Sequence, residues 1–275
     1  MNRTDAEAIV DRMQEMYQEL DAALRSSEVV AVKMEAICEV GAGFQNAPRH
    51  TSPFRYLSTS DKLAELRRTL AKNIFRDVKA LVGDACAVGS TPLVVDDEGL
   101  LREQWLPERR VADGFSPRAV FDDLWHATAP SAMEDASRQV ANAFIRAFRL
   151  RPGKDVKRVG GSIVLEVRVY ECSIFKSMGQ KQYSSDQPIR EGVVALAGVL
   201  STMDPSQSDR LLREMGRMPR TFQPGGRPAY ILATEGGNIT VSTFLGKAEF
   251  RIPAEMAQAI NAFVGEHGTA WLEAA

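Results

Sequence analysis

The stretch that most constrains the fold is residues 227–263, RPAYILATEGGNITVSTFLGKAEFRIPAEMAQAINAF. The apolar run AYILA precedes Gly236-Gly237-Asn238 and the alternating segment ITVSTF follows it, which is typical of two β-strands joined by a tight turn with positive φ. A nucleotide-binding loop would place a helix N-terminus directly after the glycines, whereas here a second strand follows. Pro253 then opens a helix. We therefore expect a β-hairpin followed by a helix.

Residues 1–150 are predicted to be mostly helical. A helix over 5–40, with a break near Ser26-Ser27, would bury one apolar stripe, and a helix over 60–83 would bury another. Further helices are expected over 116–130, opened by Ser116-Pro117, and over 131–150, with a short strand near 92–95. The first stripe is Ile9, Met13, Met16, Leu20 and Leu24, and the second is Leu63, Leu66, Leu70, Ile74, Val78 and Leu81.

The character of the chain changes after the turn at residues 151–153. Residues 161–172 alternate with period two, as in a strand with one buried face, and helices are expected over 189–203 and 206–218. The inward residues of this strand would be Ile163, Leu165, Val167 and Val169. The fold class is thus α+β, with a helical N-terminal half (1–150) and a smaller antiparallel-sheet and helix C-terminal region (151–275). The two regions form either two domains or one continuous domain.

Composition limits the chemistry. The net charge of 275 residues is −2, so any contact with nucleic acid must come from a local basic patch. The three cysteines form no CxxC pair and lie far in sequence from the three histidines, so we expect neither a metal site nor a disulfide framework, and no cofactor. No apolar run is long enough to span a membrane, and the first residues lack the apolar core of a signal peptide. A cytoplasmic protein without membrane contact is expected.

Two basic helix faces are the candidate binding surfaces. On the helix over 60–83, four cations recur at steps of four, four and three residues and would form a ridge opposite the leucine stripe. These cations are Arg68, Lys72, Arg76 and Lys79. Such ridges suit sequence-independent contact with phosphates. The alternatives are a solvated face paired with acids such as Glu65 and Asp77, and contact with an acidic protein partner.

The helix over 131–150 repeats this pattern and leads into a basic turn. Asp135 is an acid available to pair with this ridge, and Asp155 is the single acid in the turn. The ridge is Arg138, Asn142, Arg146 and Arg149, and the turn adds Arg151, Lys154, Lys157 and Arg158.

A third candidate is Asp122, Asp123 and His126 on one short helix. Asp122 and His126 are four residues apart and could share a metal or a proton. No further ligand stands at a recognisable spacing, and neighbouring Trp125 favours a structural role. We assign no catalytic residue, because the chain lacks a GxSxG segment and a recognisable cysteine nucleophile motif.

Three segments in this order resemble a known family: DKLAELRRTLAKNIFRDVKALVG, FSPRAVFDDLWHATAPSAMEDASRQVANAFIRAF and AYILATEGGNITVSTFLGKAEFRIPAEMAQAINAF. They look like an uncharacterised domain family of bacterial plasmids, prophages and integrative elements, some of whose members are fused to DNA adenine methyltransferase domains. The resemblance covers about half of the chain and implies a mobile-element setting. Unlike those fused members, this chain has no Asn-Pro-Pro-Tyr or Asp-Pro-Pro-Tyr segment and no glycine-rich loop for S-adenosylmethionine, so methyl transfer is not expected.

We therefore expect a non-enzymatic accessory protein of a mobile element, acting in DNA metabolism or host-defence conflict by binding DNA through the basic helix faces. The alternative is a protein-binding inhibitor or adaptor of a host defence complex, using an apolar patch with Trp105 or Trp125 and no nucleic acid. The expected partner is thus DNA, or a host or mobile-element protein. An enzyme would need a pocket in which Asp122, Glu134 and His126 converge.

Overall fold

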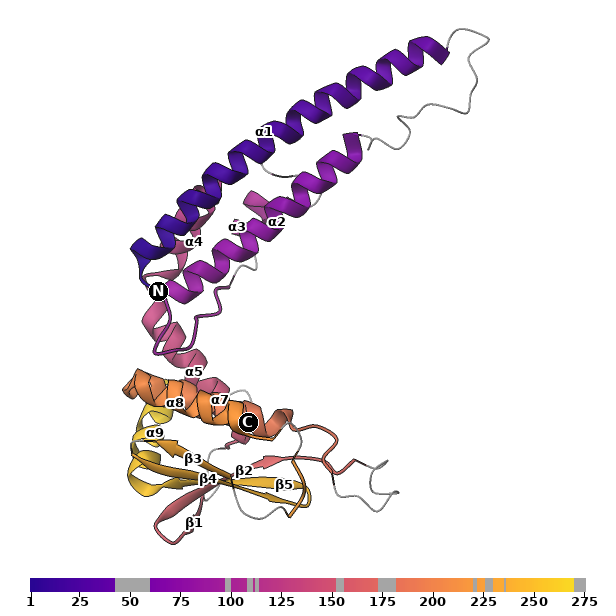
Figure 1. The fold of residues 1–275 in the computed structure, drawn as a ribbon. Coiled ribbons are helices and arrows are strands. Elements are labelled where there is room, and N and C mark those ends of the chain that lie inside the picture. The colour runs from indigo at the N-terminus through magenta and orange to yellow at the C-terminus, as the bar shows by residue number, and fades with distance from the viewer. Residues whose placement is uncertain are drawn as a thin grey trace. The chain divides into compact units, whose positions relative to one another are not determined.

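The computed structural model describes residues 1–42, 60–96, 100–107, 111, 114–151, 156–172, 182–219, 222–225, 230–234 and 236–269. Helices come first and an antiparallel sheet with helices follows, which confirms the α+β class (Figure 1). The chain divides into two compact units: unit 1 is residues 1–86 and 94–130, and unit 2 is residues 87–93 and 131–275. The composition changes at 151–160, whereas the units divide at residues 130–131, so the helix that follows Ser131 belongs to unit 2.

Unit 1 is helical. It contains α1 (Arg3–Ala42), α2 (Ser60–Ala85), α3 (Leu100–Trp105) and α4 (Pro117–Thr128). α1 packs on α2 and α4, and α2 also packs on α4. α4 begins as expected at Ser116-Pro117: the Ser116 hydroxyl accepts a hydrogen bond from the backbone N–H of Ala119, and proline occupies the first helical position. The strand expected over 92–95 is wrong, because those residues adopt no regular structure.

Most of the stripe predicted for α1 does not form its buried face. Leu24 is buried as predicted, but it is buried together with Val10 and Tyr17, whereas Ile9, Met16 and Leu20 are between 42% and 71% exposed. The prediction failed because α1 carries two adjacent apolar stripes, and periodicity alone does not say which one meets the neighbouring helices.

The backbone of α1 also does not break near Ser26-Ser27, although those two residues interrupt the apolar pattern. Their hydroxyls donate to the carbonyls of Ala22 and Ala23, one turn back, so the hydroxyl groups are satisfied inside a continuous helix.

On α2 the predicted stripe is correct towards its C-terminal end. Ile74 and Val78 are buried there together with Phe75 and Val82. Leu66, which lies near the helix start, is 53% exposed.

Unit 2 is a five-stranded antiparallel sheet with helices packed on it. The strand order is β1-β2-β5-β4-β3. α5, α7 and α9 pack on β2, α9 also packs on β5, and α8 packs on β3 (Figure 1). The elements are α5 (Ala132–Phe148), β1 (Lys157–Val159), β2 (Ser162–Arg168), α7 (Gln187–Met203), α8 (Pro205–Arg217), β3 (Tyr230–Thr234), β4 (Gly237–Phe244), β5 (Lys247–Pro253) and α9 (Ala254–His267).

The hairpin expected from the C-terminal stretch is confirmed and extended. Thr234 pairs with Gly237 at the β3–β4 turn, and Gly237 has φ +118°. One strand is predicted between this turn and Pro253, but a turn at Gly246 (φ +82°) divides the segment into β4 and β5. Pro253 precedes the first residue of α9, as expected.

The core of unit 2 lies between the sheet and the helices. The predicted inward set of β2 is correct, because Leu165, Val167 and Val169 belong to the core and Ile163 packs against it. Leu196 of α7 is fully buried in the same cluster.

Replacing Leu196 by alanine should destabilise the protein. The lost burial and the remaining cavity are expected to cost about 2–5 kcal/mol of the free energy of unfolding. Met203→Ala, on the same helix at a side chain that is 43% exposed, should change that free energy by less than about 0.5 kcal/mol. Urea denaturation followed by circular dichroism measures both. Equal effects would show that α7 is not packed as described.

Candidate anion-binding groove

The basic ridge predicted on α2 is not continuous. The Arg68 side chain turns back into unit 1: one terminal nitrogen lies 3.4 Å from the Pro107 carbonyl oxygen, and Nε is buried without a hydrogen-bond partner among the described residues. Arg76 lies 3.3 Å from the carboxylate of Asp77. Lys72 is exposed and Lys79 is half-buried. The prediction of an outward-facing ridge is therefore wrong for Arg68. The spacing of residues along α2 does not show that a distant segment, at Pro107, contacts this side chain.

The ridge predicted on α5 divides into two halves. Arg138 forms ion pairs with Glu134 and Asp135 one turn earlier. Asn142 accepts a hydrogen bond from the backbone N–H of Thr269 at 2.8 Å and donates to the Thr269 hydroxyl at 3.0 Å. The first half of the ridge is thus used inside unit 2.

The second half of the ridge lines a groove. This groove has a volume of about 520 Å³ and lies along α5, α7 and the end of β2. Arg146 lines it from α5, Arg149 from the cap of that helix, and Arg190 from α7. The first two of these arginines belong to the predicted ridge. Arg190 was missed, because a residue on a different helix has no spacing relation to them.

The floor of the groove is apolar, and its charge is positive. Among the described lining residues, Arg146, Arg149 and Arg190 are accompanied by one carboxylate, that of Glu191. Arg168 also lines the groove. Because successive side chains of a strand point to opposite faces, its guanidinium points away from the face of Val167 and adds no charge to the groove. The apolar lining includes Val140, Ala143, Ala147, Val167, Val194 and Ala195.

The three arginines differ in how they are held. Arg190 donates to the Pro219 carbonyl at 2.9 Å, which fixes one end of its guanidinium. Asp186, one turn earlier on the chain, accepts the Phe222 N–H at 3.0 Å. Burial raises the pKa of the Asp186 carboxyl above its ordinary value, although the Phe222 N–H and the nearby Arg190 charge oppose that rise. Among the described residues Arg149 has no ion-pair partner.

Arg149 also adopts an unusual backbone conformation. It caps α5 with φ +49° and ψ +45°, and it is the single described non-glycine residue with positive φ. Left-handed geometry at a helix C-terminus is normally provided by glycine. An arginine there costs stability, and such strain often marks functional positions.

The basic residues that follow α5 do not extend the groove. Arg151 and Arg158 are exposed, and the Lys157 Nζ lies 3.5 Å from the Glu249 carboxylate. None of the three lines the groove. Lys154 lies outside the described residues.

A second basic surface lies on α8 and was not predicted. Arg210, Arg213 and Arg217 line a shallow pocket with Glu214. Arg217 pairs with Glu214 at 2.7 Å, and the Arg213 Nε donates to the Asp209 carbonyl. Their steps of three and four residues could have been read from the sequence.

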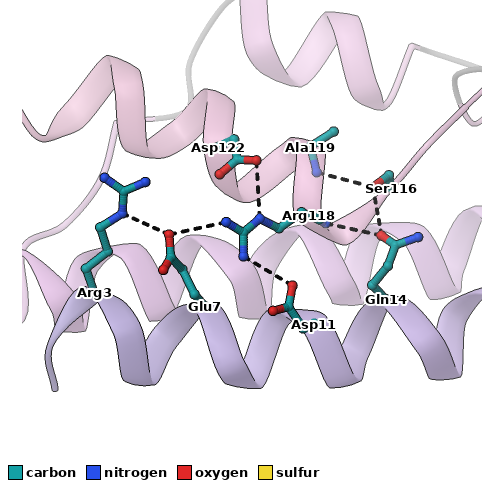
Figure 2. Close-up of polar contacts among 8 residues, drawn as sticks. All are labelled: Arg3, Glu7, Asp11, Gln14, Ser116, Arg118, Ala119 and Asp122. Carbon is teal, nitrogen blue, oxygen red and sulfur yellow. Dashed lines mark hydrogen bonds and ion pairs between the residues drawn. The ribbon is translucent and has the colours of Figure 1, made fainter.

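The acidic candidate on α4 is a structural ion-pair network. Arg118 of α4 contacts Glu7 and Asp11 of α1 and Asp122 of its own helix, at 3.1–3.3 Å (Figure 2). Desolvation alone would lower the pKa of Arg118, but the carboxylates of Asp122 and Asp11 outweigh it and raise that pKa above its ordinary value. Gln14 of α1 accepts hydrogen bonds from the Ser116 hydroxyl and the Arg118 backbone N–H (Figure 2). The network joins the start of α4 to α1.

The other residues proposed for that site are hydrogen-bonded to a neighbour, exposed, or part of unit 2. Asp123 accepts the Trp105 indole N–H at 2.9 Å, and His126 is exposed. Glu134 belongs to unit 2 and pairs with Arg138. Within the described residues no group of three His, Cys, Asp or Glu side chains could hold a metal ion.

Both tryptophans of the alternative binding patch take part in the packing of unit 1. Trp105 meets Phe115 edge-on at 6.1 Å between ring centres. Trp125 stacks on Phe121 at 5.8 Å, and the Arg3 guanidinium lies 5.0 Å from the centre of its ring. Both side chains are half-buried.

No family model, curated protein or solved structure matches the chain. Among its described helices none is both long and apolar enough to cross a bilayer.

Arg149→Gly should stabilise the protein. Glycine adopts the left-handed conformation without a Cβ clash, so the free energy of unfolding should rise by about 1 kcal/mol, reduced by the greater freedom of glycine in the unfolded chain. Urea denaturation of both proteins measures the difference. Arg149→Ala, which keeps the Cβ, is the control and should not stabilise. A loss of stability in Arg149→Gly would contradict the described cap.

Proposed function

We propose that the protein is a non-enzymatic accessory protein of a mobile element that binds single-stranded DNA through the groove of unit 2. One observation carries the proposal: Arg146, Arg149 and Arg190, contributed by two helices, line one groove with an apolar floor. Guanidinium groups form strong charge-assisted hydrogen bonds with phosphate oxygens. The excess of three cations over one carboxylate favours an anionic ligand.

The apolar floor favours a single strand over a duplex. A duplex presents phosphates on its outside but covers its base faces by stacking. An unpaired strand offers phosphates to the arginines and apolar base faces to the floor. Among the described residues that line this groove none is aromatic, so these residues offer no stacking of the kind used by tight single-strand binders. Binding should therefore be modest and independent of sequence.

The mobile-element setting comes from the family resemblance, and a role in DNA metabolism or host-defence conflict goes with it. The protein-binding alternative stays a prediction. Trp105 and Trp125 do not favour it, since each already packs on a phenylalanine within unit 1.

The test is anisotropy of a labelled oligothymidylate of about 20 nucleotides, titrated at several salt concentrations. Three phosphate contacts predict a slope of about −2 for log K against log salt. Arg149→Ala and Arg190→Ala should each weaken binding roughly 5–10-fold at low salt and flatten that slope by about 0.7, because each removes one phosphate contact.

Arg138→Ala is the matched control. It removes an arginine from the same helix, but one already paired with Glu134 and Asp135, so affinity and slope should stay as in the unchanged protein. A duplex of the same length should bind more weakly. Absence of binding at low salt, or an equal loss in all three arginine variants, would sink the proposal.

A further inference from the structure

α1 carries an exposed apolar stripe in addition to its buried one. Ile9 is 42% exposed, Met16 71% and Leu20 45%, and Met13 between them is half-buried. These four residues follow one another at steps of four, three and four, which is the spacing of a coiled-coil seam. We call them the α1 seam.

The seam is separate from the face that α1 uses inside unit 1. Val10, Tyr17 and Leu24 are buried and repeat every seven residues along the neighbouring side of the helix. That side packs on α2 and α4. A second apolar stripe that stays exposed on such a helix commonly marks an interaction surface.

Two oppositely charged residues flank the seam. Arg12 and Glu19 are exposed, stand seven residues apart, and have no ion-pair partner among the described residues. The apolar seam ends before Ser27, whose hydroxyl is bonded to the Ala23 carbonyl. The surface is therefore short and apolar along its centre, with one positive and one negative charge along one border.

We propose that the α1 seam pairs with the α1 seam of a second copy of this chain, with the two helices antiparallel. In this register Met13 lies opposite the partner's Met16 and Ile9 lies opposite the partner's Leu20. Arg12 then comes within reach of the partner's Glu19, and the two-fold axis forms this pair twice.

The charges select the antiparallel orientation. In a parallel pair the residues across from Arg12 and Glu19 would be the partner's Tyr17 and the partner's Leu24. Tyr17 and Leu24 are already buried inside unit 1, so the two charges would gain no partner. Of the two arrangements, the antiparallel one is complementary to itself in charge.

The expected dimer is of modest affinity. From Ile9 to Leu20 a helix spans roughly 18 Å, which is short for a standard protein–protein interface. Association should therefore depend on concentration.

Sedimentation velocity of the full chain over a broad concentration range tests the inference. The unmodified protein, of 30.3 kDa, should pass from monomer to dimer as its concentration rises. Met16→Glu should weaken the dimer roughly 100-fold, because it places a carboxylate in the seam. Met133→Glu on α5, at a side chain that is 78% exposed, is the control and should dimerise normally.

A charge exchange tests the register. Arg12→Glu and Glu19→Arg should each weaken the dimer roughly tenfold, because each sets like charges opposite one another twice. The double variant should restore dimerisation, and circular dichroism should confirm that every variant keeps its helices. The inference fails if the protein stays monomeric at all concentrations, if Met16→Glu leaves the dimer intact, or if the double variant is not rescued. A dimer that survives the seam variants would place the interface elsewhere.

Discussion

The groove of unit 2 depends on how closely α7 lies against two phenylalanines. A Cβ added at Gly192 would lie 3.0 Å from Phe250 Cζ, closer than most side chains tolerate, and 3.4 Å from Phe148 Cζ. The rings of Phe148 and Phe250 meet edge-on, 5.3 Å between centres. One contact point thus joins α5, α7 and β5. Arg149 follows Phe148 directly and Arg190 precedes Gly192 by two residues, so the same contact fixes both walls of the groove.

The arrangement of charge around the groove is costly for the protein. Bringing guanidinium groups together raises their mutual repulsion, and holding Arg149 at positive φ adds backbone strain. The apolar floor leaves hydrophobic surface open to water. The repulsion and the exposed apolar surface would both decrease when an anion with an apolar part occupies the groove, which supports the proposed binding role. Such local conflicts are expected where function competes with stability.

Much of the fold could be predicted from sequence because its signals are local. The Ser116-Pro117 helix start, the Gly236-Gly237 turn and the period-two strand before Cys172 each depend on residues close together in the chain. The site could be predicted only in part. Arg146 lies on α5 and Arg149 caps that helix, so their spacing along the chain predicts them, whereas Arg190 meets them only after α7 folds onto α5. Distant segments also engage residues that were expected to bind a ligand. Arg68 donates to the Pro107 carbonyl, and Asn142 accepts a hydrogen bond from Thr269.

The central claim is that three arginines of unit 2 act together on one anionic ligand. Side-chain NMR of the arginine Nε–H groups tests it most directly, by adding an oligothymidylate of about ten nucleotides at low salt. The account predicts that the signals of Arg146, Arg149 and Arg190 shift together along one binding curve, while that of Arg138 stays in place. Unchanged signals for the three, with shifts confined to Arg210, Arg213 and Arg217 of α8, would contradict it.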